Sequence, residues 1–203
     1  MEATPGLRER KKQRTREAIV EAAFELFDER GFDGTTIADI AEAAEIAPRT
    51  FFSYFPSKDD VVFHDFEEKF GMFASWLRER EPGTNTVDAL RAGVQTMIGE
   101  ADPEHLDQKR LAKRLISQNQ SLAAHAQHLR GKFAELLVES VAKDLGDDPG
   151  NLRPRLVAAA ATAAMGVIDD MPDDDVEHSM ETIDSLLVFL RGGLSELQDH
   201  ARG

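Results

Sequence analysis

The sequence predicts an all-α protein of about nine helices, and three observations support this fold class. Apolar residues recur at spacings of three and four along most of the chain, whereas the alternation typical of β-strands is absent. Segments with glycine and proline, such as 81–84 and 146–150, separate the periodic stretches. The chain has 203 residues, 41% of them hydrophobic, which is enough for one large core or two smaller ones.

Three helices are expected in the N-terminal region. The first begins near Arg10 and ends at Gly31, a residue type favoured just after a last helical turn. The second follows Thr36, a good N-cap, and Pro48 opens the third at a position where proline is tolerated. Pro56 ends the third helix. Two short helices joined by a tight turn are typical of a helix-turn-helix, which places its second helix in the major groove of DNA.

The third predicted helix has two faces. Phe51 and Phe55 lie one turn apart and are expected to be buried. The outer face carries the polar residues Arg49, Thr50, Ser53 and Tyr54. A polar, arginine-bearing face suits a helix that reads DNA, whereas a helix that serves only as scaffold has no use for it.

The rest of the chain is expected to form a larger helical bundle. Ser57 caps a long fourth helix, with Asp60 in a capping-box arrangement. The apolar stripe of this helix consists of Phe63, Phe66, Phe70, Phe73 and Leu77. Further helical patterns cover about 86–100, 104–118, 122–145, 154–171 and 176–197. We therefore expect two domains, residues 1–60 and 61–203.

The last two helices predict a homodimer. The final one carries an apolar heptad seam, and the one before it presents mostly alanine, so that two backbones can approach closely. The predicted interface residues are Leu156, Ala160, Ala163, Val167, Ile183, Leu187, Leu190 and Leu194. Pairing with a second copy would form a four-helix bundle about a two-fold axis. The alternative is a core within one chain only.

Charge is distributed unevenly along the chain. The formal net charge of −14 argues against indiscriminate nucleic-acid binding. Residues 1–16 carry six basic side chains and two acidic ones, a net charge of +4, so the other 187 residues carry −18. A basic arm on an acidic body fits a protein that binds DNA at one end. The alternative is a basic tail with no partner.

Several classes of function find no support in the sequence. Cysteine is absent, and with it disulfides and thiolate chemistry. Phosphate-binding glycine loops and nucleophile elbows are absent, and His125 and His128 lack further metal ligands. We therefore predict no enzyme, no catalytic residue, no metal site and no cofactor. No apolar run reaches the roughly 18 residues of a membrane span, so we expect a soluble cytoplasmic protein associated with the nucleoid.

The segment from Leu7 to Phe63 combines several features in a specific spacing. They are Gly31-Phe32, the pair Thr35-Thr36, the run Thr50-Phe51-Phe52 and the run Pro56-Ser57-Lys58. This segment closely resembles the DNA-binding domain of TetR-family transcriptional regulators. The resemblance implies a homodimeric repressor that binds a palindromic operator in double-stranded DNA and is released by a small molecule. Ala47, where the family usually has Ser or Thr, and Phe52, where Tyr is usual, depart from the pattern.

The resemblance also implies roles for individual residues. The expected DNA-binding residues are Arg10, Arg14, Arg16, Thr36, Arg49, Thr50, Phe52, Ser53, Tyr54 and Lys58. Thr36 would bind phosphate through its hydroxyl and its N–H. Arg49 would make a bidentate contact to guanine, while Phe52 retains only an apolar contact. Tyr54 and Lys58 would hold phosphates, and the arginines of the arm would reach phosphates or an adjacent minor groove.

Beyond Phe63, the chain resembles a branch whose C-terminal domain binds acyl-CoA-like ligands. A small hydrophobic effector of that kind is therefore expected. Its predicted pocket residues are Phe66, Phe70, Phe73, Trp76, Met97, Leu111, Leu115 and Phe133. The alternative for these residues is an ordinary packed core.

Two other functions remain open at the level of sequence. One is a regulator of the same fold that activates transcription, or that needs its ligand in order to bind DNA. The other is a helical small-molecule-binding protein that retains the motif only as scaffold.

Overall fold

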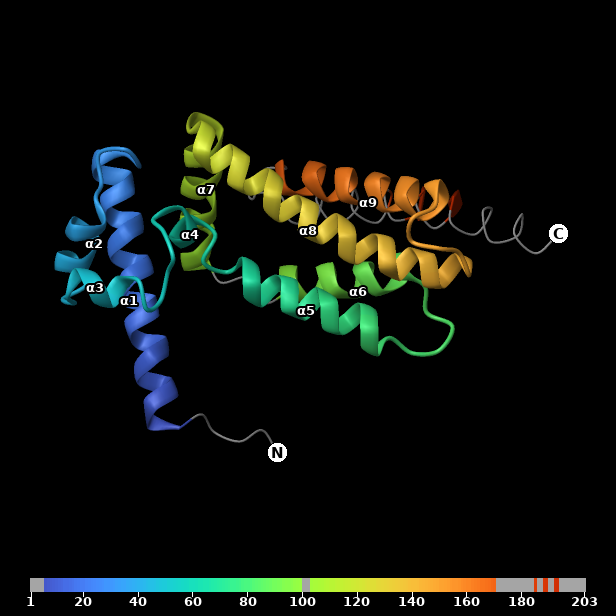
Figure 1. The fold of residues 1–203 in the computed structure, drawn as a ribbon, viewed down its shortest axis with the longest axis horizontal. Helices are drawn as coiled ribbons and strands as arrows, with labels where there is room; N and C mark the ends of the chain where they lie inside the picture. Colours follow the sequence, from blue (N-terminus) through green and yellow to red (C-terminus); the bar gives the residue numbers. More distant parts are fainter. Residues whose placement is uncertain (1–5, 100–102, 171–184, 186–187, 190–191, 194–203) are drawn as a thin grey trace. The chain divides into compact units, whose positions relative to one another are not determined.

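The computed structural model describes residues 6–99 and 103–170, together with 185, 188–189 and 192–193, and for 97–99, 103–105, 165 and 167–170 it describes only the backbone. Within these ranges the chain forms helices and no strand (Figure 1), which confirms the predicted all-α class. The helices are α1 (Leu7–Arg30), α2 (Ile37–Ala43), α3 (Pro48–Phe51), α4 (Asp59–Val62), α5 (Phe66–Glu79), α6 (Thr86–Gly99), α7 (Pro103–Gln118), α8 (Gln120–Leu145) and α9 (Leu152–Asp170).

The chain divides into two compact units. The first comprises residues 1–65 and 103–126, and the second comprises 66–102 and 127–203. Helix α7 and the first residues of α8 thus belong with the N-terminal helices. This division differs from the predicted one, in which everything after residue 60 forms the second domain.

The first unit is built around α1. This helix packs against α2, α4 and α7, and it ends at Gly31, whose φ of 76° suits glycine. The buried side chains at the centre of the unit include Ile19, Ala23, Phe27, Ile40, Phe51, Phe55, Val61, Leu111, Leu115 and Leu122. Apolar residues of α7 and α8 thus complete the core of the helix-turn-helix unit.

Three hydrogen bonds to carboxylates also connect α7 and the start of α8 to this unit. The hydrogen bonds run from Arg114 to Asp28 at 3.1 Å, from Asn119 to Asp33 at 3.0 Å, and from Ser121 to Asp59 at 2.9 Å. Their acceptors lie on α1, on the turn that follows it and on α4. Residues 103–126 therefore join the first unit through polar contacts as well as through buried leucines.

The predicted long fourth helix is wrong, because it is interrupted between α4 and α5. At the interruption the guanidinium of Arg16 donates a hydrogen bond to the carbonyl of His64. The ring of Phe63 stacks on His125, with 4.8 Å between centroids. These contacts bind residues 63 and 64 to the rest of the first unit.

The second unit packs α5, α6, α8 and α9 around one core. Its buried side chains include Phe73, Leu77, Val87, Leu90, Val94, Leu137, Val141, Leu145, Ala158 and Ala161. Gly93 of α6 lies directly against the indole of Trp76, since an added Cβ would meet that ring at 2.1 Å. The contact between α5 and α6 is therefore filled by an aromatic side chain at this point.

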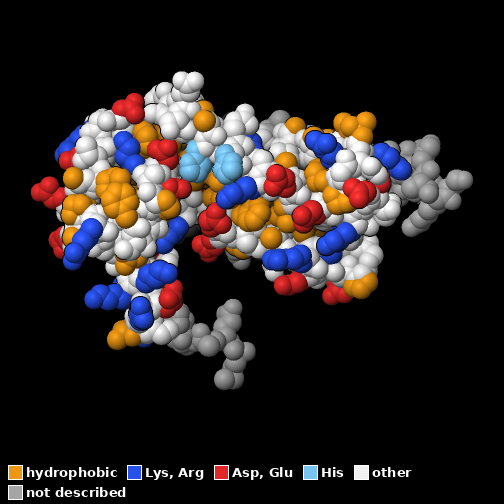
Figure 2. All heavy atoms as spheres, viewed as in Figure 1, with side chains coloured by type: hydrophobic (Ala, Val, Ile, Leu, Met, Phe, Trp, Pro, Cys, Tyr) orange, Lys and Arg blue, Asp and Glu red, His pale blue; other side chains and the backbone are white. Residues whose placement is uncertain are grey.

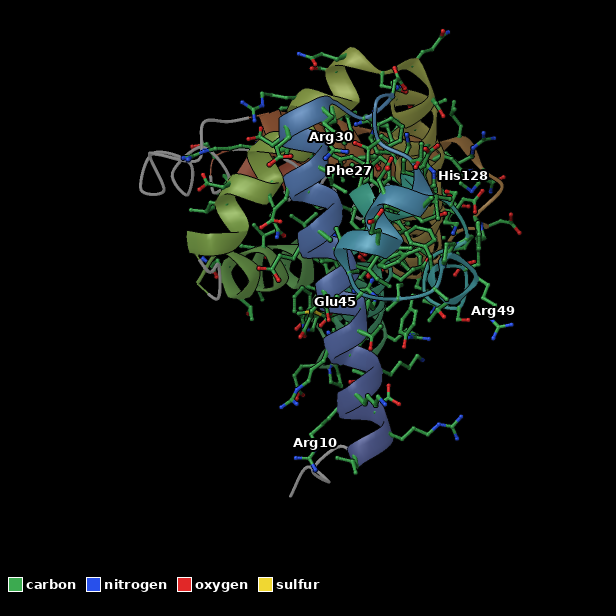
Figure 3. The ribbon with its side chains drawn as sticks, turned by 90° about the vertical axis from the view of Figure 1, so that its left-hand side faces the viewer. Arg10, Phe27, Arg30, Glu45, Arg49 and His128 are labelled. Atoms are coloured by element: carbon green, nitrogen blue, oxygen red, sulfur yellow. The ribbon has the colours of Figure 1, made fainter. Side chains whose placement is uncertain are left out.

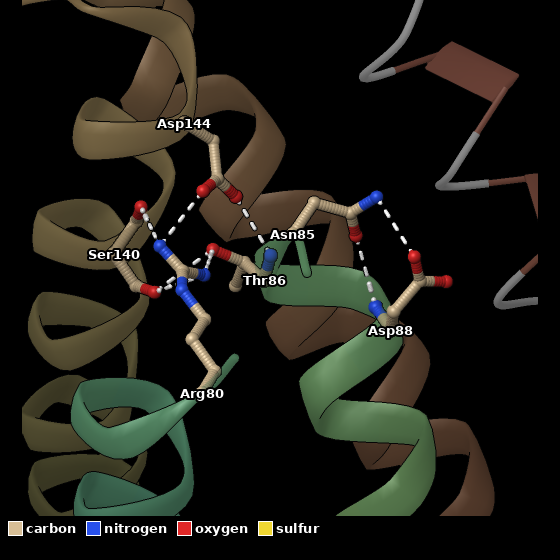
Figure 4. Close-up of polar contacts among 6 residues, drawn as sticks. All are labelled: Arg80, Asn85, Thr86, Asp88, Ser140 and Asp144. Carbon is tan, nitrogen blue, oxygen red and sulfur yellow. Dashed lines mark hydrogen bonds and ion pairs between the residues drawn. The ribbon is translucent and has the colours of Figure 1, made fainter. Parts of the chain in front are cut away.

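A buried polar network crosses the second unit (Figure 4). The guanidinium of Arg80 donates to Asp144 at 2.7 Å and to the hydroxyls of Thr86 and Ser140 at 2.9 and 3.1 Å. The second carboxylate oxygen of Asp144 accepts the backbone N–H of Thr86 at 2.7 Å. The network thus ties the end of α5 and the start of α6 to α8.

Candidate nucleic-acid interface

A capping box begins α2, the first helix of the helix-turn-helix. Thr36 is the N-cap, as predicted, and its hydroxyl accepts the N–H of Asp39 at 3.1 Å. In return, the N–H of Thr36 donates to the Asp39 carboxylate at 2.8 Å, and the Thr36 hydroxyl contacts the same oxygen. Both groups that were expected to bind phosphate therefore already have an internal partner.

The capping box also predicts how Asp39 titrates. Hydrogen bonds from the hydroxyl and then the N–H of Thr36 hold the pKa of Asp39 below its ordinary value of 3.8. Its contribution to stability is therefore present at neutral pH and is lost only as the pH falls through this lowered pKa. We expect Thr36→Val to raise the pKa of Asp39, measured by NMR titration of the carboxyl groups. Thr36→Ser is the matched control; an unchanged pKa in Thr36→Val would contradict the assignment.

The turn between α2 and α3 contains a residue in an unusual conformation. Glu45 has a φ of 54°, in the left-handed region that favours glycine. Next to it, the N–H of Ile46 donates to the carbonyl of Ala41 at 2.9 Å, which closes the turn. Ala47 precedes α3 without a side-chain cap, as the sequence indicates, and Pro48 begins the helix. The turn is thus held by the backbone rather than by a capping hydroxyl.

Helix α3 and the turns over residues 52–54 that follow it have a buried inner face and a solvent-exposed outer face. Phe51 and Phe55 are buried, as predicted. Arg49, Phe52 and Ser53 are exposed, and Phe52 keeps 57% of its surface accessible. Figure 3 shows Arg49 extending away from the ribbon. An exposed guanidinium and an exposed apolar ring next to a hydroxyl form a surface that can meet base edges in a major groove.

The other two residues of the predicted reading face are less accessible. Thr50 and Tyr54 are half-buried, and Tyr54 packs against the core of the first unit. Beyond α3 the backbone continues in turns. The N–H of Phe55 donates to the carbonyl of Phe51 at 3.0 Å. Arg49, Phe52 and Ser53 are therefore the most exposed residues of the predicted DNA-reading surface.

Residues 7–16 of the basic arm are helical. They form the first turns of α1, where residues 7–14 are exposed, including Arg10 and Arg14. Figure 2 shows Lys and Arg side chains gathered along this end of α1, and Figure 3 labels Arg10 there. Arg16 differs from the prediction, because its guanidinium binds the carbonyl of His64 and lies 5.0 Å from the centre of the Phe55 ring. The guanidinium of Arg16 therefore makes contacts within the first unit.

Lys58, which was predicted to bind phosphate, also has internal partners. Its ammonium donates to the carbonyl oxygens of Phe32 at 2.5 Å and Thr35 at 2.8 Å. Burial lowers the pKa of Lys58, and the carboxylates of Asp33 and Asp59 oppose this shift. The ammonium is therefore bound within the first unit.

Comparison with known proteins identifies the chain. Residues 19–64 match the family of bacterial regulatory proteins of the tetR type, and residues 84–195 match the MftR C-terminal domain. The regulator TcmR of Streptomyces glaucescens is 31% identical to the chain over 200 residues, which cover 92% of the chain and 87% of TcmR. The chain belongs to the TetR family of transcriptional regulators. This family consists of DNA-binding regulators, so the prediction that the protein is not an enzyme is confirmed.

Two further similarities bear on the C-terminal part of this TetR-family protein. MftR of Mycobacterium tuberculosis is 30% identical over 149 residues, which cover 73% of the chain and 75% of MftR. The TetR-family repressor FadR of Thermus thermophilus, solved in complex with lauroyl-CoA, has a TM-score of 0.53 and 22% identity. The similarity covers 87% of the chain and 93% of that structure. At this identity the likeness establishes the fold alone.

The predicted pocket residues of the TetR-family protein do not gather at one place. Phe73 packs edge-on against Trp76 and Phe133, with ring centroids 5.1 and 5.3 Å away, in the core of the second unit. Phe66 and Phe70 stack on each other at 5.6 Å and are half-buried. Leu111 and Leu115 lie instead in the core of the first unit. The side chain of Met97 lies outside the described residues.

The described parts of the second unit contain an open hollow. It measures about 480 Å³ and lies beside the turn between α5 and α6. Its lining includes Arg78, Arg80, Glu81, Asn85, Lys143 and Asp144. This lining is polar, unlike the aromatic one that was expected. In the described residues, no three His, Cys, Asp or Glu side chains gather as a metal site requires, and no helix is long and apolar enough to cross a membrane.

Proposed function

We propose that the protein is a repressor that binds an inverted-repeat operator as a homodimer and is released by a small hydrophobic effector. The observation that carries this proposal is the pairing of an exposed reading surface on α3 with a buried anchor. Arg49, Phe52 and Ser53 face solvent, whereas Phe51 and Phe55 fix the helix in the core. An exposed arginine on a segment held by two buried rings suits direct readout of a guanine. Its place of action would be the nucleoid.

The proposed dimer uses α9 and the helix that the sequence predicts over 176–197. On α9, Ala158 and Ala161 are buried in the second unit, whereas Leu156, Ala160 and Ala163 are exposed, Leu156 by 58%. The exposed stripe therefore does not belong to the core that the described residues form, which supports pairing with a second copy. Val167, Ile183, Leu187, Leu190 and Leu194 lie outside the described side chains. A monomer in analytical ultracentrifugation at micromolar concentration would contradict the dimer.

Two observations support an acyl-CoA-like effector: the fold shared with FadR and a pair of half-buried aromatic rings on α5. FadR of Thermus thermophilus, which shares the fold, was solved with lauroyl-CoA. In this chain the half-buried pair Phe66 and Phe70 could meet an acyl chain if the packing around α5 opened. A ligand weakens operator binding by no more than the difference in its binding free energy between the released and the DNA-bound state of the protein. Such differences are typically about 1–3 kcal/mol.

A gel shift on the DNA upstream of the protein's own gene tests this function. We expect a sequence-specific complex that lauroyl-CoA weakens, while coenzyme A alone and laurate alone separate recognition of the head group from recognition of the chain. A reporter gene behind the same DNA should be more active without the protein. Lower reporter activity in its absence would make it an activator.

The arm should supply non-specific affinity for DNA. Deleting residues 2–12 removes Arg8, Arg10, Lys11 and Lys12, whereas deleting residues 2–6 removes no basic residue and is the matched control. We expect the longer deletion to weaken operator binding. The slope of log affinity against log salt should flatten by about 0.9 for each phosphate that the arm no longer neutralises. Affinity for DNA and its salt dependence are measured by fluorescence anisotropy. If both are equal for the two deletions, the arm does not contact the DNA.

A further inference from the structure

Gly93 of α6 leaves room for the indole of Trp76, which lies on α5. A Cβ added at Gly93 would meet three ring carbons of Trp76 at 2.1, 2.3 and 3.1 Å. Gly93 lies within a helix and has no positive φ, so its backbone conformation does not require glycine. Glycine inside a helix is also less favourable than alanine. The role of glycine at this position is therefore to make space for the ring.

The indole of Trp76 is not fixed by polar contacts. Trp76 is half-buried, and its N–H donates no hydrogen bond within the part of the chain that the structure describes. Its ring packs edge-on against Phe73, with 5.1 Å between centroids, and Phe73 packs in the same way against Phe133. Movement of the indole away from Gly93 therefore breaks no hydrogen bond to a described residue.

The place beside Gly93 has the chemistry that an alkyl chain requires. Trp76 packs against the apolar core of the second unit, which includes Phe73 and Val94. The hollow beside the turn between α5 and α6 is lined instead by polar and charged residues such as Lys143. Apolar ligands are bound mainly by apolar and aromatic side chains. An alkyl chain therefore fits the place of the indole better than it fits the hollow.

We propose that in the free protein the indole of Trp76 fills the place beside Gly93 that an alkyl chain of the effector takes in the complex. This inference rests on the proposed function for the identity of the effector. A ligand that requires a minor conformation binds less tightly in proportion to the population of that conformation. Minor conformations typically have populations of about 0.1–10%. Removal of the indole should therefore raise the affinity for an alkyl chain by about tenfold or more.

The first test measures the binding of laurate by isothermal titration calorimetry. We expect Trp76→Ala to bind laurate at least about tenfold more tightly than the wild type. Adding Gly93→Ala to Trp76→Ala places a methyl group in the vacated space and should weaken this binding. Adding Gly71→Ala instead is the matched control on α5, because a Cβ there meets nothing within 4 Å. Unchanged affinity in Trp76→Ala, or equal effects of the two glycine substitutions, would overturn the proposal.

A second test keeps the indole, in case Trp76→Ala does not fold. Trp76 is the single tryptophan of the chain, so tryptophan fluorescence reports on this place alone. Saturation of the wild type with lauroyl-CoA should shift the emission to longer wavelength and increase quenching by acrylamide, because the indole enters water. An unchanged spectrum with lauroyl-CoA bound, as shown by calorimetry, would overturn the proposal and leave the proposed effector intact.

A third test needs no effector. In the otherwise unmodified chain, Gly93→Ala should produce the same shift of the emission without ligand, whereas Gly71→Ala should not, with circular dichroism as the check on folding. If the wild type binds no lauroyl-CoA, the proposed effector is wrong. The emission of Gly93→Ala then still decides whether the indole can leave its place, and an unchanged emission would overturn the proposal.

Discussion

Arg80→Met is expected to destabilise the second unit by about 3–5 kcal/mol, as removal of one partner from a buried ion pair typically does. The side chains of Arg80 and Asp144 are only 13% and 7% exposed. Without the guanidinium, the Asp144 carboxylate loses its ion pair with Arg80 and retains the hydrogen bond from the N–H of Thr86. The substitution also removes the hydrogen bonds from Arg80 to Thr86 and Ser140. Urea unfolding followed by circular dichroism measures the change.

Two variants show whether the buried charge is the cause. Arg80→Met combined with Asp144→Asn should recover part of the stability, because the amide removes the charge while its oxygen still accepts from Thr86. Lys132→Met makes the same change in an exposed pair, in which Lys132 lies 3.5 Å from Glu67. We expect it to cost no more than about 0.5 kcal/mol. Equal effects of Arg80→Met and Lys132→Met would show that burial of the pair does not matter.

Arg49→Ala is expected to cost about 1–3 kcal/mol of discrimination in each half of the operator, the usual contribution of a bidentate contact to guanine. That corresponds to a decrease of roughly 5- to 150-fold for each half-site. The decrease should be confined to operators that carry the contacted guanine, because affinity for unrelated DNA depends on phosphates. Operators with each position of the half-site changed in turn, bound to wild type and to Arg49→Ala, locate the contacted base.

Arg14→Ala is the matched control for Arg49, since Arg14 is an exposed arginine on the arm. It should weaken all sequences by a similar factor and flatten the salt dependence. If Arg49→Ala instead weakened every sequence alike, Arg49 would be a phosphate ligand and the reading surface would have to lie elsewhere on α3.

Local patterns made much of the first unit predictable. Gly31 ends α1, Thr36 caps α2 and Pro48 begins α3, because each position places a strong requirement on backbone or hydrogen bonding. Phe51 and Phe55 are buried because their spacing puts them on one side of a short helix that must pack. These features depend on residues close together in sequence.

Features that depend on distant residues were not predictable in the same way. Arg16 and Lys58 are basic residues near a DNA-reading motif, and only the fold reveals that carbonyls of His64, Phe32 and Thr35 bind them. The break between α4 and α5 interrupts an apolar stripe that runs through it without change of period. Periodicity predicts that a residue is buried but not the core to which it belongs.

Leu111 illustrates that limit, and Glu45 illustrates another. The spacing of Leu111 fits any helical core, and the fold assigns it to the first unit rather than to a pocket in the second. Glu45 adopts a left-handed conformation for which its residue type gives no signal. Glycine at this position would have been a recognisable sign of the turn.

We propose that α3 reads a defined sequence in each half of an inverted repeat. Selection of binding sites from a random DNA library by the full-length protein tests it most directly. We predict enrichment of an inverted repeat, with a guanine in each half-site that Arg49→Ala no longer selects. Failure to enrich any sequence, or enrichment of a single asymmetric site that Arg49→Ala selects equally well, would contradict the account.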